Sequence, residues 1–167
     1  NLNMNVENAN KYDGYNLSLA LVDALPVIFF LTGGLLLFQI FPSKWFILGI
    51  SLGTLAGTGK VLWKILLIRK IDLFWLNRQF RFLMPAGFGF LLLSVLLNVH
   101  VINWNGIGRA VTSFPSLFFF IAGLIGMTAM TLFIRKLDDS LRSNWIEQLT
   151  NMAAQLMFLL GIAFIVF

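Results

Sequence analysis

Five long apolar runs, separated by short polar segments, make up most of this chain. They cover Leu17 to Phe41, Trp45 to Ile68, Phe82 to Ile102, Phe114 to Ile134 and about 146 to 167. Each run is close to the roughly 20 residues that a helix needs to cross about 30 Å of hydrocarbon. Apolar residues are continuous rather than alternating, which excludes spanning strands. The pattern predicts an all-α integral membrane protein, a five-helix transmembrane bundle over residues 17–167 after a polar tail, 1–16.

Composition supports the membrane assignment and narrows the chemistry. Hydrophobic residues make up 59% of the chain, and its mean hydropathy of +0.86 lies far above that of soluble domains. The chain has no cysteine and one histidine, His100, which removes thiolate chemistry and histidine-rich metal sites. We find no phosphate-binding loop and no nucleophile or metalloprotease motif. We therefore expect no catalytic residues, no metal and no cofactor.

Basic residues are unevenly distributed between the connections. The two connections after the second and fourth runs contain Arg69, Lys70, Arg78, Arg81, Arg135, Lys136 and Arg142, whereas the opposite connections offer Lys44 and Arg109. Basic residues beside spans are retained in the cytoplasm. We therefore expect a cytoplasmic amino terminus, a carboxy terminus on the opposite side, and contact between the seven inner basic residues and lipid headgroups. This orientation explains the net positive charge without a nucleic-acid partner.

The second apolar run carries small and cationic residues on one helical face. Gly49, Gly53 and Gly57 recur every four residues and are followed by Lys60 and Lys64. At 100° per residue, all five fall within an arc of roughly 80°. Glycines at this spacing let another helix approach closely, which favours helix association in lipid. We expect this helix to be the most closely packed one, either within the monomer or at the seam of a homo-oligomer.

Two segments of the chain are nearly repeated. Residues 68–72 read Ile-Arg-Lys-Ile-Asp, and residues 134–138 read Ile-Arg-Lys-Leu-Asp. Phe-Pro-Ser opens both the second and the fourth runs, and counting from it places Gly126 at the position of Gly53. The pattern predicts two parallel helical-hairpin repeats and a fifth helix that resembles the first half of a third copy. It favours a sixth helix outside this sequence.

Three charged residues lie inside the first two apolar runs. Asp23 is the acidic residue within the first run, at a depth comparable to that of Lys60 and Lys64 in an antiparallel hairpin. A charge within the hydrocarbon costs about 2.5 kcal/mol or more unless it is paired or hydrated. We predict that Asp23 pairs with one of the two lysines. The trio is either a structural device that fixes helix register or a polar intramembrane site on the first two helices.

Three functions stay open at this stage. The first is a transport or channel component for an ion or small solute, which predicts a water-accessible cavity open to the cytoplasmic side. The second is a non-catalytic subunit or assembly factor of a larger membrane complex, and the third is the membrane part of a sensor. The uncharged fourth run counts against a symmetric transport site built from both repeats. All three place the chain in a lipid bilayer, with a second copy or other membrane subunits as candidate partners.

Overall fold

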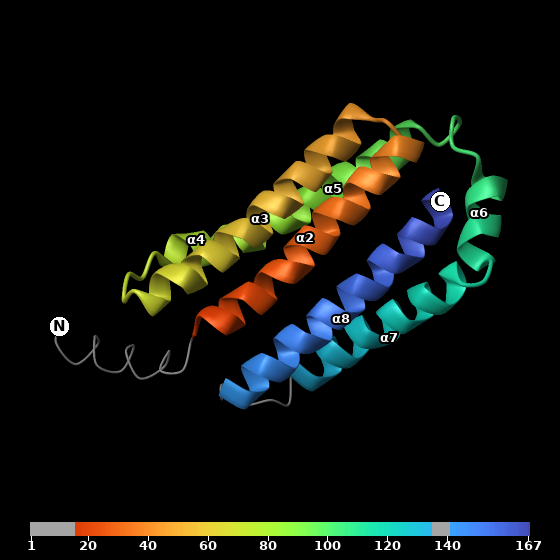
Figure 1. The fold of residues 1–167 in the computed structure, drawn as a ribbon. Helices are drawn as coiled ribbons and strands as arrows, with labels where there is room; N and C mark the ends of the chain where they lie inside the picture. Colours follow the sequence, from red (N-terminus) through yellow and green to blue (C-terminus); the bar gives the residue numbers. More distant parts are fainter. Residues whose placement is uncertain (1–15, 135–140) are drawn as a thin grey trace.

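The computed structural model describes residues 16–134 and 141–167, which form helices and their connections (Figure 1). The helices are α2 (Leu17–Ile40), α3 (Lys44–Ile68), α4 (Phe74–Arg78), α5 (Phe80–Leu97), α6 (Trp104–Thr112), α7 (Ser116–Ile134) and α8 (Leu141–Val166). No strand occurs within these residues, so the all-helical prediction is confirmed. The predicted tail, apart from Asn16, and the basic residues Arg135 and Lys136 lie outside the described residues.

Several helices are long and apolar enough to cross a membrane. The described segments that qualify by length and composition are Leu17–Ile40, Lys44–Ile68, Phe74–Leu97 and Arg142–Val166. A further candidate is the pair formed by α6 and Ser116–Leu132 of α7, which is bent by 77°. Four or five spanning helices are therefore compatible with a multi-pass membrane protein.

The third and fifth long helices begin earlier along the chain than the apolar pattern predicts. Arg78 and Arg81, predicted in a loop, lie on the helical segment Phe74–Leu97. Likewise α8 starts at Leu141, so that Arg142 belongs to its first turn. A long basic side chain can reach from a helix end toward the headgroups. A membrane helix can therefore extend past its apolar run.

The connection after α5 also differs from the prediction. The helix ends at Leu97 rather than at Ile102, because Asn98 turns back and its Nδ2 donates to the carbonyl of Ser94 at 2.8 Å. Asn side chains commonly compete with helix bonds in this way. Residues 103–113, predicted as a loop, contain the short helix α6.

A left-handed residue ends α3. Lys70 has φ of 61°, and its N–H donates to the carbonyl of Leu67 at 2.8 Å. The N–H of Ile71 donates to the carbonyl of Leu66 at 3.0 Å. These two bonds form a Schellman motif, in which glycine usually occupies the left-handed position. A lysine there bears a steric cost that glycine avoids.

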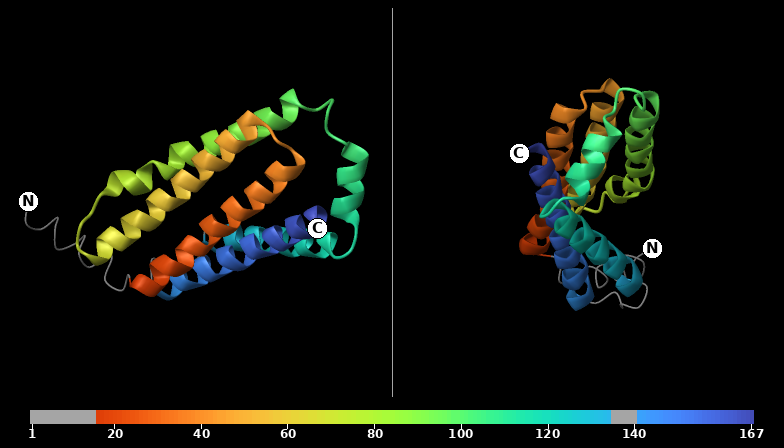
Figure 2. Two further views of the ribbon diagram at one scale, coloured as in Figure 1. Left: turned by 45° about the horizontal axis from the view of Figure 1, so that its top comes forward. Right: turned by 90° about the vertical axis from the view of Figure 1, so that its right-hand side faces the viewer.

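The long helices form a row in which each contacts its neighbours. The order is α5, α3, α2, α8 and α7, so that α2 lies in the middle (Figure 2). The predicted second hairpin, made of α5 and α7, does not form, since within the described residues these two helices are not in contact. Instead α5 packs on α3 and α7 packs on α8, and the two pairs flank α2. The internal repeat stays a prediction from the sequence.

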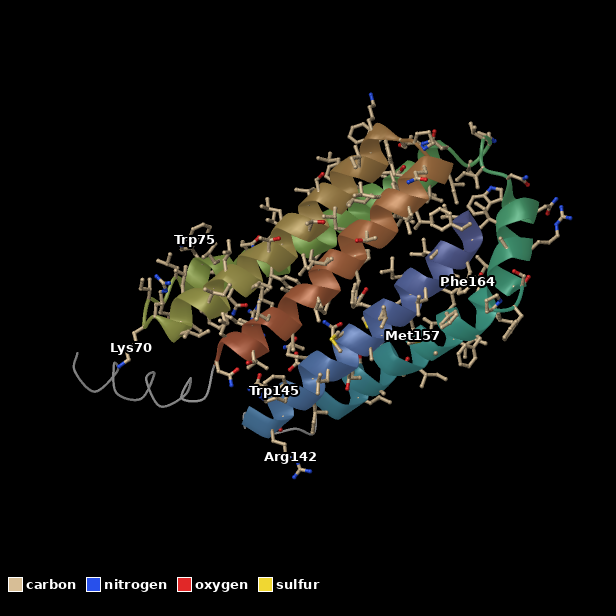
Figure 3. All side chains as sticks on the ribbon, in the orientation of Figure 1. Lys70, Trp75, Arg142, Trp145, Met157 and Phe164 are labelled. Atoms are coloured by element: carbon tan, nitrogen blue, oxygen red, sulfur yellow. The ribbon has the colours of Figure 1, made fainter. Side chains whose placement is uncertain are left out.

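Basic residues gather at one end of this row. The connection from α3 to α5 and the start of α8 lie at the same end as the start of α2 (Figure 1). Their basic residues are exposed: Arg69, Lys70, Arg78, Arg81 and Arg142. The labelled side chains of Lys70 and Arg142 point away from the helices (Figure 3). We refer to this region as the basic end; Lys44 and Arg109 lie at the opposite end.

Helix α3 is the most buried of the long helices. In its most apolar window 44% of the residues are buried, against 17% in α2 and 11% in Phe74–Leu97. Its closest neighbour is α5, where Gly49 meets Gly87 backbone to backbone. A Cβ added to Gly49 would lie 2.8 Å from the carbonyl oxygen of Gly87, and one added to Gly87 would lie 2.9 Å from that of Gly49. Only glycine permits this approach.

The remaining predicted glycines of α3 face α2. A Cβ on Gly53 would lie 2.7 Å from the ring of Phe30, and one on Gly57 would lie 2.6 Å from Cγ2 of Val27. The glycine face therefore turns from α5 toward α2 as it descends the helix. This rotation follows from the repeat of four residues, which advances the face by about 40° at each step.

The second helix pair, α7 and α8, uses the same kind of contact. A Cβ on Gly126 of α7 would lie 2.9 Å from Cβ of Ala154 on α8. Farther along, the rings of Phe119 and Phe164 stack with centroids 5.5 Å apart. Small residues and stacked rings thus hold this pair together, as packing must do where lipid weakens the hydrophobic effect.

We predict different effects from alanine at two nearby glycines of α5. Gly87→Ala places a methyl group against the backbone of α3 and should lower the free energy of unfolding by roughly 1–3 kcal/mol. Gly89→Ala is the matched control, because a Cβ there has nothing within 4 Å, and it should be neutral or stabilising. Unfolding in detergent measures both. Equal stability of the two variants would contradict the close contact between α3 and α5.

A second prediction concerns the left-handed end of α3. Lys70→Gly should raise the free energy of unfolding by about 1 kcal/mol, since glycine adopts positive φ without the steric cost. Lys70→Ala also removes the charge but keeps the strain, and should not stabilise. If both variants behave alike in the same unfolding assay, charge rather than backbone conformation governs this position.

Candidate functional site

Three polar side chains from three helices meet inside the basic end of the row. Asp23 lies in the second turn of α2, Lys64 in the last turns of α3, and Gln148 at the start of the third turn of α8. Counted along the helix axes, they lie roughly 6 to 11 Å from the nearest helix ends. All three are buried. We call these residues the polar cluster.

An ion pair forms the centre of the polar cluster. Nζ of Lys64 lies 2.8 Å from Oδ2 of Asp23, and the two side chains are only 4% and 6% exposed. The Gln148 amide is oriented by its neighbours, since a carboxylate only accepts and an ammonium only donates. Its nitrogen donates to Oδ1 of Asp23, and its oxygen accepts from Nζ of Lys64 at 3.2 Å.

Helix geometry decides which lysine joins Asp23. Measured around α3 from Gly49, Lys60 lies at about 20° and Lys64 at about 60°. The first direction is nearer to the contact with α5, and the second is nearer to the contact of Gly57 with α2. Accordingly Nζ of Lys60 lies 5.4 Å from the centre of the Phe80 ring on α5. The structure thus pairs Asp23 with Lys64, one of the two lysines predicted as its partner, and places Nζ of Lys60 over the Phe80 ring.

The polar cluster joins helices whose backbones are apart. Within the described residues, α3 and α8 have no backbone contact, because α2 lies between them. Gln148 nevertheless reaches Lys64, so one amide connects α8 to both α2 and α3. The cluster pairs one carboxylate with one ammonium, and the Gln148 amide bonds both. Neutrality and mutual hydrogen bonding are what make burial of two charges tolerable.

Two glutamines that matter here do not stand out in the sequence. Gln148 lies near the start of an apolar run, and Gln155 follows it about two helical turns later. Only the position of α8 relative to α2 and α3 shows which of the two joins the polar cluster. Gln79, which precedes α5, donates through Nε2 to the carbonyls of Ala56 and Leu76, each at 3.0 Å. This bond ties α5 to the middle of α3. Gln148 lies at a depth in its helix similar to that of Asp23, which is a signal in the sequence. Gln79 offers no such signal, because it precedes its apolar run.

The polar cluster offers acid–base and ion-binding chemistry without a metal. It supplies one carboxylate, one ammonium and one amide that both donates and accepts. Among the described residues, no group of three His, Asp or Glu side chains could hold a metal ion. The predicted packing glycines lie outside the cluster, as do the headgroup-facing basic residues that the structure describes. The chain matches none of the protein-family models, curated proteins and solved structures with which it was compared.

We predict that removing one charge of the cluster harms the protein more than removing both. Asp23→Leu or Lys64→Met alone leaves a buried unpaired charge and should cost about 3–5 kcal/mol of unfolding free energy. The double variant should recover much of that loss. Lys60→Met is the control, because this lysine is partly exposed and faces a ring, and should cost about 1 kcal/mol or less. Additive losses in the double variant would contradict a coupled pair.

Proposed function

We propose that the chain is a transport or channel component for a proton, an ion or a small polar solute, with the polar cluster as its intramembrane site. The observation that carries this proposal is the burial of the Asp23–Lys64 pair inside helices that are long and apolar enough to cross a membrane. A charge in the hydrocarbon is costly and is by default a candidate for a substrate or ion pathway. An amide that bonds both members of the pair adds a third ligand for a passing solute.

The chemistry of the cluster suggests how a solute would pass. In the arrangement described here, the carboxylate, the ammonium and the amide satisfy one another, which represents a closed state. A proton or cation that reaches Asp23 replaces the ammonium as its partner, and the released Lys64 then takes up water or an anionic group. In each half-step the released ammonium is either paired with an anion or hydrated, so no buried charge is left both unpaired and dry.

The helix arrangement supports an opening motion around α2. The pair α3–α5 and the pair α7–α8 each have close internal packing, and α2 lies between them. Beyond α2, the two pairs meet through the bond of Gln148 to Lys64. Separating the pairs at the basic end would expose the cluster to water there.

We further propose that the basic end faces the cytoplasm, because basic residues beside membrane spans are retained on the cytoplasmic side.

A second candidate function is that of a subunit or assembly factor in a larger membrane complex. The observation that favours it is the outer surface of α7, which carries no charge and exposes large apolar side chains: Phe118, Ile121, Leu124 and Ile125. Lipid or a partner helix would cover such a surface equally well. Determination of the native mass in mild detergent separates the two. Purification at a fixed ratio with other membrane subunits, without flux activity, would favour this candidate.

We predict ion or proton flux that depends on the polar cluster. Liposomes containing the purified protein should conduct protons or monovalent ions above the level of empty liposomes under an imposed gradient. Asp23→Asn should lower that flux at least tenfold, because the neutral amide cannot take up and release a proton and attracts a cation far less than a carboxylate does. Lys60→Gln is the matched control, since it removes a nearby charge outside the cluster, and should retain the flux.

Each variant is first checked by size-exclusion chromatography, where a folded protein gives a single symmetric peak, so that misfolding is not mistaken for lost transport. Flux that persists unchanged in Asp23→Asn would show that the cluster is structural. Absence of flux in the wild type for protons, sodium and potassium alike would contradict the proposal for these solutes.

A further inference from the structure

Helix α6 separates apolar from polar residues around its axis. At 100° per residue, its apolar side chains fall within an arc of about 120°; they are Trp104, Ile107, Ala110 and Val111. The other side carries Asn105, Gly108, Arg109 and Thr112. With nine residues the helix is about 14 Å long, too short to cross a bilayer. Its pattern is that of a helix at a boundary between apolar and polar surroundings.

The direction of α6 fits a boundary parallel to the bilayer. It is bent by 77° from α7 at the junction around Ser113. If α7 crosses the membrane close to the bilayer normal, α6 therefore lies nearly in the membrane plane. It contacts both α7 and α8 and lies across their ends, opposite to the basic end (Figures 1 and 2). The body of the bundle lies on one side of α6 and its other side faces outward.

Large apolar side chains stand exposed at both ends of α6. Val101 before the helix is 82% exposed and Phe114 after it is 86% exposed. Trp104 is half exposed, and its indole N–H donates to the carbonyl of Val99 at 2.9 Å. Exposure of three such residues to water would be unfavourable. At the level of lipid headgroups, by contrast, apolar rings reach acyl chains and an indole keeps a polar partner.

The polar side of α6 presents one cation. Thr112 Oγ1 donates to the carbonyl of Gly108 at 2.7 Å, so this hydroxyl is satisfied within the helix. Arg109 is exposed and uses Nε for a bond of 3.3 Å to the carbonyl of Asn105. The planar guanidinium has further N–H groups that suit bidentate bonding to phosphate.

We propose that α6 is an interfacial helix that rests in the phospholipid headgroup layer of the leaflet opposite the basic end. Its apolar side faces the acyl-chain boundary together with Val101 and Phe114, and Arg109 bonds lipid phosphate. The helix would thereby fix the depth at which α7 begins. This proposal requires α7 to span the bilayer, but it holds for any of the functions considered above.

The absence of cysteine from the chain makes the proposal directly testable. Single variants Ile107→Cys on the apolar side and Asn105→Cys on the polar side of α6 receive a nitroxide spin label. Leu124→Cys, on the exposed surface of α7, serves as the control for the bilayer interior. Each labelled protein is reconstituted into vesicles of phosphatidylcholine and phosphatidylglycerol. Collision with oxygen and with a water-soluble nickel chelate then gives the depth of each label.

An interfacial helix predicts a graded result. The label at 107 should favour oxygen and lie near the acyl-chain boundary, the label at 105 should favour the nickel chelate by severalfold, and the label at 124 should lie deepest. Equal, high nickel accessibility at 105 and 107 would overturn the proposal by placing α6 in water. Depths at 105 and 107 equal to that at 124 would overturn it by placing α6 inside a broken span. A shallow label at 124 would overturn it as well, because α7 would then not span.

Discussion

Helices surrounded by lipid gain little from burying apolar surface, so close backbone approach and buried polar contacts must hold them together. In this chain both devices meet on α3. Its glycine face admits α5 at Gly49 and α2 at Gly57, and Lys64 on the same face reaches Asp23 on α2 and Gln148 on α8. Because α3 packs on α5 in one direction and on α2 in another, it lies between them in the row. Helix α2 contacts α8 as well, which places it in the middle.

The bundle contains two closely packed helix pairs, α3–α5 and α7–α8, rather than one uniform core. Gly87 closes the contact between α3 and α5, and Gly126 closes that between α7 and α8. Between the pairs lies α2, which packs on α3 at Gly53 and Gly57 and on α8 at Gly33, and which adds Asp23 to the polar cluster of charges and an amide. Polar contacts of this kind have fixed geometry but can exchange partners, whereas a glycine crossing cannot loosen without losing its packing. Any conformational change is therefore expected at the polar cluster.

The sequence predicts the parts of this structure that depend on local pattern. Continuous apolar runs predict the helices, and the four-residue spacing predicts which face of α3 packs closely. Intramembrane charges likewise predict a pairing of Asp23. What the sequence does not predict depends on how the helices are rotated and arranged. The choice of Lys64 over Lys60 depends on about 40° of rotation of α3. Gln148 joins the polar cluster only because α8 rather than α7 lies beside α2. The repeat suggests a hairpin of α5 and α7 because adjacent spans usually pack, but a separate helix, α6, lies between them.

The measurement that most directly tests this account is the distance between the two helix pairs, determined by double electron–electron resonance on Thr58→Cys in α3 and Ala153→Cys in α8. Both positions are exposed, and the chain has no other cysteine. If the polar cluster holds the pairs together, the wild type should give one main distance, and Lys64→Met should add a longer one while Lys60→Met does not. An unchanged distribution in Lys64→Met, with the protein still folded, would contradict the claim that the cluster connects the two pairs.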